Sequence, residues 1–253
     1  MSMFEIVFSP TGGTEKVSGL VTGALDGNIV TVDLTDSGLD FHGVSMAKGD
    51  VAVISVPSYA GRVPAVAVER LGMVRGNGAR AVLVCVYGGR AFEDTLIELE
   101  DVAKRAGFRV VAAVSAIAEH SVARQFAAGR PDAQDVAQLS EFAQRIRQKL
   151  LDEAASEPSI PGNRPYKQVG GHSMVPHATE DCVSCGACAA LCPVRAIDKD
   201  DPRQVDGEAC ISCMRCVSVC SQNARKLDPN KLAAVTQMLS KACVERRECE
   251  IFI

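Results

Sequence analysis

The sequence of 253 residues has no strongly basic stretch, and its formal net charge is −4. Proteins that bind nucleic acid neutralise its phosphates with clustered lysine and arginine, so this charge pattern argues against nucleic acid as a partner. The sequence also lacks an apolar run that approaches the roughly 20 residues needed to cross a bilayer as a helix. We therefore expect a protein without a membrane partner.

The first residues lack the features of a secretory signal peptide. No basic segment is followed there by an apolar stretch and a small-residue cleavage site. They indicate instead a strand that runs into a glycine turn, and we expect a cytoplasmic protein. The chain does contain 11 cysteines. Disulfides suit small secreted chains, and most of these cysteines lie too close together to pair freely, so a metal or iron–sulfur role is favoured.

Short runs rich in valine and isoleucine alternate with helical patterns through residues 1–151, which we expect to form one domain. We expect strands over 4–8, 28–34, 51–56, 79–87 and 108–116, and helices over 14–24, after Pro64, over 92–106 and over 132–151. This alternation predicts a parallel sheet with helices on both faces. Five strands match the doubly wound α/β fold with strand order 2-1-3-4-5.

The rest of the chain divides into three parts. Prolines and glycines are frequent over 152–175, which predicts a linker or a wrapping strap. Cysteines dominate residues 176–228. Residues 229–253 are expected to form one helix, from about 230 to 244, followed by a short apolar tail.

Two cysteine runs share the spacing C-x2-C-x2-C-x3-C, and the second repeats the first 28 positions later. The runs are Cys182, Cys185, Cys188 and Cys192, and then Cys210, Cys213, Cys216 and Cys220. Soft thiolates suit iron–sulfur clusters, and this spacing is the bacterial two-cluster pattern. Paired zinc knuckles are the alternative, but they need neither a third cysteine at the same short interval nor a fourth three residues later.

At these residues the segment 176–228 resembles the two-cluster bacterial ferredoxins. The resemblance implies a small α+β domain with two [4Fe–4S] clusters, in which the fourth cysteine of each run ligates the other cluster. One ligand set would be Cys182, Cys185, Cys188 and Cys220, and the other Cys210, Cys213, Cys216 and Cys192. Ser221 stands where a proline is usual after the second run, and we expect this to alter local rigidity without the loss of a ligand.

A glycine-bearing turn follows the first predicted strand and precedes a helix. It consists of Ser9, Pro10, Thr11, Gly12, Gly13 and Thr14. Such a turn directs backbone N–H groups and a helix N-terminus at an anion. It is neither a Walker A loop nor G-x-G-x-x-G, which argues against NAD bound here. It resembles the flavodoxin phosphate loop at Ser9, Thr11, Gly12 and Thr14, and this resemblance implies FMN.

Two more segments resemble the flavin-ring loops of flavodoxin-like proteins, and both follow predicted strands at the edge where such folds bind ligands. The first holds Pro57, Ser58, Tyr59, Ala60, Gly61 and Arg62, and the second holds Tyr87, Gly88, Gly89, Arg90, Phe92, Glu93 and Asp94. Tyr59 offers a ring for stacking on the isoalloxazine. Ala60 and Gly61 permit close approach of the backbone to the flavin, and Glu93 or Asp94 is a candidate acceptor for a ring N–H.

The order of these parts resembles the flavodoxin–ferredoxin fusion family of anaerobic bacteria and archaea. The resemblance implies an electron-transfer iron–sulfur flavoprotein that passes electrons between FMN and two [4Fe–4S] clusters, to or from partner redox proteins. The alternative is an FMN-dependent reductase of a small molecule, with His120, His172 and His177 as candidate proton donors. No catalytic residue is identified, and a homodimer is left open. Cys85 is expected in the core, whereas Cys243 and Cys249 are either structural thiols or a redox pair.

Overall fold

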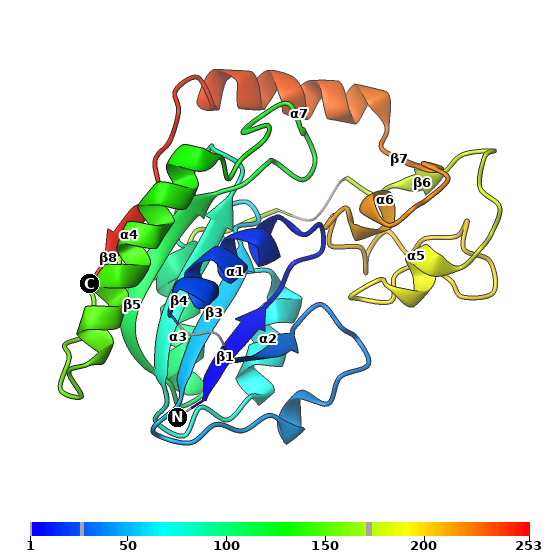
Figure 1. Ribbon diagram of the computed structural model, residues 1–253. Coiled ribbons are helices and arrows are strands. Elements are labelled where there is room, and N and C mark those ends of the chain that lie inside the picture. The colour runs from blue at the N-terminus through cyan, green and yellow to red at the C-terminus, as the bar shows by residue number, and fades with distance from the viewer. Residues whose placement is uncertain (1, 26–27, 171–173) are drawn as a thin grey trace.

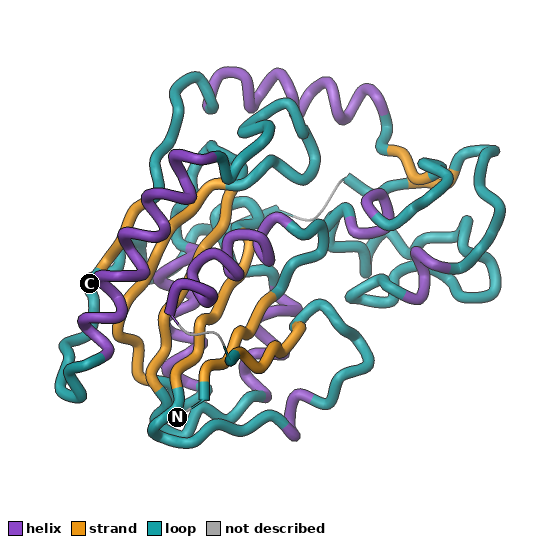
Figure 2. Tube along the Cα trace, in the orientation of Figure 1, coloured by secondary structure: helices purple, strands orange, loops and turns teal. Residues whose placement is uncertain are grey.

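The computed structural model describes residues 2–25, 28–170 and 174–253 (Figure 1). The N-terminal part forms a central sheet between layers of helices, and the cysteine-rich part lies to one side of it, beyond one end of the strands (Figure 1). Loops make up most of the cysteine-rich part (Figure 2).

The central sheet has the strand order β2-β1-β3-β4-β5-β8. Its first five strands are parallel and follow the predicted order 2-1-3-4-5: β1 (Met3–Val7), β2 (Ile29–Asp33), β3 (Val51–Pro57), β4 (Arg80–Tyr87) and β5 (Arg109–Ile117). Residues from 51 to 56 are all buried, as are those from 81 to 87. A parallel strand covered on both faces must be apolar throughout, which explains the unbroken valine-rich runs. The flavodoxin-like fold class is confirmed.

The sixth strand, β8 (Glu250–Phe252), corrects the prediction of a five-stranded sheet. It pairs antiparallel with β5, with Phe252 opposite Ala113. Ile251 packs against the core on one face of the sheet and Phe252 against the core on the other. Three residues are too few to show the alternation of side chains that is typical of a strand. The sequence of the apolar tail therefore did not predict that it pairs with the sheet. Its pairing covers part of a sheet edge that would otherwise expose unpaired N–H and C=O groups.

Four helices cover the sheet. On one face, α1 (Gly13–Leu25) and α4 (Ala133–Leu150) contribute Val17, Val21, Leu139 and Ile146 to a core. On the other face, α2 (Ala65–Met73) and α3 (Thr95–Arg105) contribute Leu71, Leu96 and Leu99. The helix predicted from residue 92 begins at Thr95, because residues 92–94 form the turn that follows β4. The doubly wound arrangement therefore rests on two separate cores.

The cysteine-rich part is a small α+β unit whose two halves repeat in backbone conformation as well as in sequence. It holds β6 (His177–Ala178) paired antiparallel with β7 (Arg225–Lys226), and the short helices α5 (Ala187–Ala190) and α6 (Arg215–Ser218). Left-handed residues recur 28 positions apart, at Ser184 and Ser212, at Gly186 and Met214, and at Arg195 and Asn223. A non-glycine residue with positive φ is uncommon. Its repetition at equivalent positions shows that the two halves adopt the same backbone conformation.

Arginines connect the two parts of the molecule. Arg195 Nη2 donates to the Ser37 carbonyl at 2.7 Å, and Arg70 donates to the carbonyls of Leu34 and Pro193. A guanidinium offers five N–H donors in a fixed fork, which suits it to bridging carbonyls on separate segments. After β7, α7 (Pro229–Ala242) leads back towards the sheet, where β8 lies (Figure 1).

Candidate functional site

The eight motif cysteines line two small cavities of nearly equal size. One is lined by Cys192, Cys210, Cys213 and Cys216. The other is lined by Cys182, Cys185, Cys188 and Cys220. Each cavity thus draws three cysteines from one run and the fourth from the other. These are the two groupings that the ferredoxin resemblance implied.

Backbone donors support the fourth cysteine of each run in the same way. The N–H of Ala196 donates to Cys192 Sγ, and the N–H of Ala224 donates to Cys220 Sγ, both at 3.3 Å. Such N–H groups stabilise sulfur that carries negative charge, as it does when bound to iron. The donor set and its hydrogen bonds therefore fit a cluster at each cavity. Among the described residues, no three His, Cys, Asp or Glu side chains are grouped closely enough to hold one metal ion.

Burial dominates the chemistry of the second run. It raises the pKa of the Cys213 thiol to about 11 and that of the Cys216 thiol to about 12. Both are therefore neutral thiols at pH 7 in the metal-free chain. Iron binds the thiolate, so binding must release these protons.

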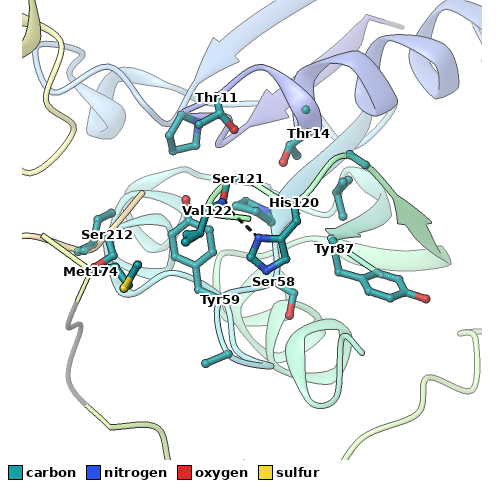
Figure 3. A pocket seen from close by; sticks show the side chains of 18 of the residues that line it. Thr11, Thr14, Ser58, Tyr59, Tyr87, His120, Ser121, Val122, Met174 and Ser212 are labelled. Atoms are coloured by element: carbon teal, nitrogen blue, oxygen red, sulfur yellow. Dashed lines mark hydrogen bonds between the residues drawn. The ribbon is translucent and has the colours of Figure 1, made fainter. Parts of the chain in front are cut away.

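A separate cavity of about 300 Å³ lies at the carboxyl ends of the parallel strands (Figure 3). All three loops predicted to hold the flavin contribute to it, through Pro10, Thr11, Gly13, Thr14, Pro57, Ser58, Tyr59, Ala60, Tyr87 and Gly88. Ligand sites of doubly wound folds occur at this edge of the sheet, and the volume is at the lower end of the range for cofactor pockets.

The first of these loops has the donors that a phosphate needs. Hydrogen bonding within α1 begins with the N–H of Lys16, which donates to the Gly12 carbonyl at 2.9 Å. The helix itself therefore leaves the N–H groups of Gly13 and Thr14 unused. The Ser9 hydroxyl accepts from the N–H of Glu15 at 2.9 Å and so caps the helix. Anions bind well at such an N-terminus, because the helix dipole adds to the free N–H groups.

Tyr59 lies between this cavity and the cysteine-rich part. It pairs with Arg62 through two backbone hydrogen bonds across a tight turn, in which Ala60 and Gly61 both have positive φ. This conformation brings the turn's backbone to the cavity and needs a small second residue, since a Cβ on Gly61 would lie 1.9 Å from Glu93 Oε2. Burial, followed by the nearby Cys213, raises the pKa of the Tyr59 hydroxyl, which stays protonated.

Several residues predicted to bind the flavin contact other parts of the protein. Arg62 forms a bidentate ion pair with Glu98, with both N–O distances at 2.7 Å, and donates to the Lys167 carbonyl. Glu93 accepts from Arg90 and Lys167. Outside the lining of the cavity lie Ser9, Gly12, Gly61, Arg62, Gly89, Arg90, Phe92, Glu93 and Asp94. Their contact with a flavin stays a prediction.

The cavity has a fourth loop, residues 118–122 after β5, which our sequence analysis did not predict as a flavin loop although it named His120 within it as a candidate proton donor. Ligand loops in this fold follow the carboxyl ends of the strands, and this loop follows β5 in the same way. It contains no glycine that would have distinguished it in the sequence. His120 projects from this loop into the cavity (Figure 3), and its Nδ1 accepts from the N–H groups of Val122 and Ala123 at 3.2 Å. Burial, and secondarily Arg90, lowers the pKa of His120, so the ring is neutral with its proton on Nε2.

The other two candidate histidines have different positions. His177 begins β6 and does not line the cavity, and His172 lies outside the described residues. Among the cysteines outside the motif, Cys85 is fully buried within β4, as predicted. Cys249 is also buried, and its thiol donates to Asp135 Oδ1 at 3.7 Å, whereas Cys243 is partly exposed at the end of α7.

Ile211 connects the cavity at the strand ends to the cysteines. It lies between Cys210 and Cys213 and lines both that cavity and the cavity of the second cysteine run. Its neighbour Ser212 lines the first of these as well. Arg215 Nη1, from the same run, donates to the Pro10 carbonyl in the loop before α1 at 3.3 Å. Nothing in the cysteine spacing indicated which run would face the sheet.

Comparisons with known proteins bear on both parts of the chain. The family model of the 4Fe-4S dicluster domain matches residues 150–237. A Streptococcus pneumonia TIGR4 flavodoxin is 21% identical, with 58% of this chain and 99% of that chain covered at a TM-score of 0.41. A flavodoxin from the domain Archaea is 11% identical, with 60% and 100% covered at 0.43. No curated protein sequence is similar enough to count as a match.

The strand order of the sheet and the family match therefore describe two consecutive units. Residues 3–117 form a parallel sheet in the order 2-1-3-4-5, which defines the flavodoxin-like fold. Residues 150–237 match the dicluster model and group their cysteines around two cavities. Among the helices described, none combines the length and the apolar character that crossing a membrane requires. The chain thus joins a domain with the flavodoxin-like fold to a segment that matches the family of 4Fe-4S dicluster domains.

Proposed function

We propose that this protein is an electron-transfer iron–sulfur flavoprotein that holds FMN and two [4Fe–4S] clusters. FMN exchanges electrons singly or in pairs and each cluster exchanges one, so joining them couples a two-electron event to single-electron steps. The proposal is supported above all by Ile211, which lines both the cavity at the strand ends and that of the second cysteine run. One side chain thus separates the proposed flavin site from a proposed cluster site.

We infer an order of the groups from the residues that line the cavities. Cys192, Cys210, Cys213 and Cys216 would hold the cluster next to the flavin. Cys182, Cys185, Cys188 and Cys220 would hold the outer cluster, where Cys185 and Val183 are exposed. Partner redox proteins would then exchange electrons with the outer cluster, because exposed apolar surface beside an accessible ligand suits docking.

Analysis of protein prepared without oxygen is the first test. Denaturation should release FMN, and iron analysis should give about eight irons per chain. Protein that stays colourless and contains zinc would contradict the cluster assignment. Protein that retains its iron but takes up no FMN after anaerobic reconstitution would contradict the flavin assignment alone.

Two cysteine variants test the order. In Cys185→Ala, which damages the outer cluster, photoreduced FMN should still reduce the remaining cluster rapidly. In Cys213→Ala, which damages the inner cluster, reduction of the remaining cluster should be much slower, since the nearer acceptor is lost. Stopped-flow absorbance follows both reactions. Equal rates in the two variants would show that the order is wrong.

The alternative predicted from the sequence, an FMN-dependent reductase of a small molecule, needs room for a substrate beside the ring. Val169, Gly170 and Met174 line the cavity, and Met174 is buried. These three residues would limit the space over a bound ring, which favours the carrier. Steady catalytic consumption of a small-molecule acceptor that enters this cavity, with electrons fed through the clusters, would instead support the reductase.

A further inference from the structure

The two halves of the cysteine-rich unit differ at one buried position. Five residues after the fourth cysteine of the first run stands Ile197, and five residues after the fourth cysteine of the second run stands Arg225. The exposed fractions of the two side chains are only 4% and 2%. Ile197 lines the cavity of the second run and Arg225 lines the cavity of the first. A guanidinium thus occupies the place that an apolar side chain fills in the other half.

The guanidinium of Arg225 contacts a cysteine of the first run. Its Nη2 lies 3.4 Å from Cys188 Sγ and also donates to the Pro202 carbonyl. Its Nε and Nη1 are buried and have no hydrogen-bond partner within the described ranges. No carboxylate of the described residues forms an ion pair with it.

A buried cation without a carboxylate is costly to the metal-free fold, because removing a charged group from water carries a large free-energy penalty. Thiolate and sulfide sulfurs of an oxidised or reduced cluster carry negative charge and accept hydrogen bonds. A cluster in the cavity lined by Cys182, Cys185, Cys188 and Cys220 would therefore supply both the acceptors and the countercharge that Arg225 lacks.

We propose that Arg225 raises the reduction potential of the outer cluster, the one held by Cys182, Cys185, Cys188 and Cys220. An added electron makes the cluster more negative, and a fixed cation with N–H donors at its sulfurs stabilises that charge. The inner cavity has Ile197 at the corresponding place. The arginine that lines the inner cavity, Arg215, is less buried and donates to the Pro10 carbonyl, and only its Nε is buried without a partner among the described residues. An electron that enters at the flavin would thus be drawn towards the exposed end of the molecule.

This inference rests on the ligand sets of the proposed function, and the test separates the two. Wild type and Arg225→Ile, which introduces the residue of the other half, are titrated anaerobically and followed by EPR. One of the two cluster potentials should fall clearly more than the other. Arg203→Ala is the matched control: Arg203 reaches the same cluster loop through the Cys182 carbonyl at 2.7 Å but is exposed, so solvent screens its charge. This variant should keep both potentials.

Arg225→Gln serves as the second variant, because it keeps an N–H donor while it removes the charge. If Arg225→Ile fails to hold iron, a lowered potential in Arg225→Gln supports the inference. Potentials equal to those of wild type, with about eight irons retained in either variant, would overturn it and leave Arg225 a structural residue. Wild type without two clusters would instead contradict the proposed function.

Discussion

The backbone N–H of Lys167 donates to Asp94 Oδ2 at 2.6 Å, and this contact fixes the segment after α4 over the loop that follows β4. The other carboxylate oxygen, Asp94 Oδ1, accepts from both the backbone N–H and the side-chain amide of Asn163. Gly162 packs against Ile97, where any Cβ would lie 2.3 Å from the isoleucine Cγ2. Residues 162–167, part of the segment predicted as a linker or a wrapping strap, thus lie against the N-terminal domain, and Val169 and Gly170 line the cavity at the strand ends.

Replacement of Asp94 tests whether this clamp shapes the flavin site. Asp94→Ala removes the acceptor of three donors and should lower the free energy of unfolding by about 2–3 kcal/mol. FMN should also bind more weakly, because Val169 and Gly170 lose their support. Glu157→Ala is the control: it breaks an exposed ion pair between the same segment and Lys104 and should cost about 1 kcal/mol or less. Equal FMN affinity in wild type and Asp94→Ala, measured by fluorescence titration, would contradict the idea.

The affinity for FMN should depend on pH through the protonation of His120. Its pKa lies below the usual value because of burial, so the folded loop favours the neutral ring. As pH falls through about 6.5, the unfolded loop gains a proton that the folded loop resists, and the folded loop becomes less stable. Protonation of Nδ1 also breaks its two hydrogen bonds with Val122 and Ala123. FMN affinity should therefore weaken below pH 6.5, and His120→Asn should flatten that dependence.

The crossing of the fourth cysteines between the two cavities makes a separate prediction. Cys192→Ala should damage the cluster that the second run holds, and Cys220→Ala the cluster that the first run holds. Each variant should lose up to about four irons, and the two should keep different EPR signals. Cys243→Ser is the control and should keep all its iron, because Cys243 lines neither cavity. Identical remaining spectra in Cys192→Ala and Cys220→Ala would argue against the crossing.

Thiol labelling checks the same assignment without mutation. Cys85 and Cys249 are buried, and burial raises the pKa of Cys249 to about 11, so neither forms the reactive thiolate readily. By the proposed ligand sets, iron would protect the eight motif cysteines. Brief alkylation of the native protein should therefore modify Cys243, whereas all 11 cysteines react after iron is removed and the chain is unfolded. Peptide mass spectrometry identifies the labelled positions, and rapid labelling of any motif cysteine in fully loaded protein would contradict its role as a ligand.

Replacement of Phe252, the last residue of β8, tests how much this strand contributes to stability. Phe252 packs edge-on against Phe92, with ring centroids 6.5 Å apart. Because Phe252 is only partly buried, Phe252→Ala should lower the free energy of unfolding by about 1–3 kcal/mol. Ile253→Ala should change it by less than about 0.5 kcal/mol, since that side chain is exposed. Urea unfolding of the two variants measures the difference, and equal values would show that β8 adds little.

Local sequence patterns predicted those features of this protein that depend on residues close together in the chain. Unbroken apolar runs predicted the five parallel strands, because a strand covered on both faces has no polar side. The spacing of the cysteines predicted an iron–sulfur domain, because three thiolates on one tight loop must reach one cluster. Ser9, Thr11, Gly12 and Thr14 predicted an anion loop at the first strand, since that chemistry lies within one turn of chain.

Only the tertiary structure decided the relations between distant segments. The pairing of β8 depends on the free edge of β5, the clamp on Lys167 depends on Asp94 some 70 residues earlier, and the place of Ile211 between two cavities depends on which run faces the sheet. Arg225 was visible in the sequence, but its significance came from its burial beside Cys188. Such contacts form where surfaces meet, so their physical cause is the packing of the whole chain.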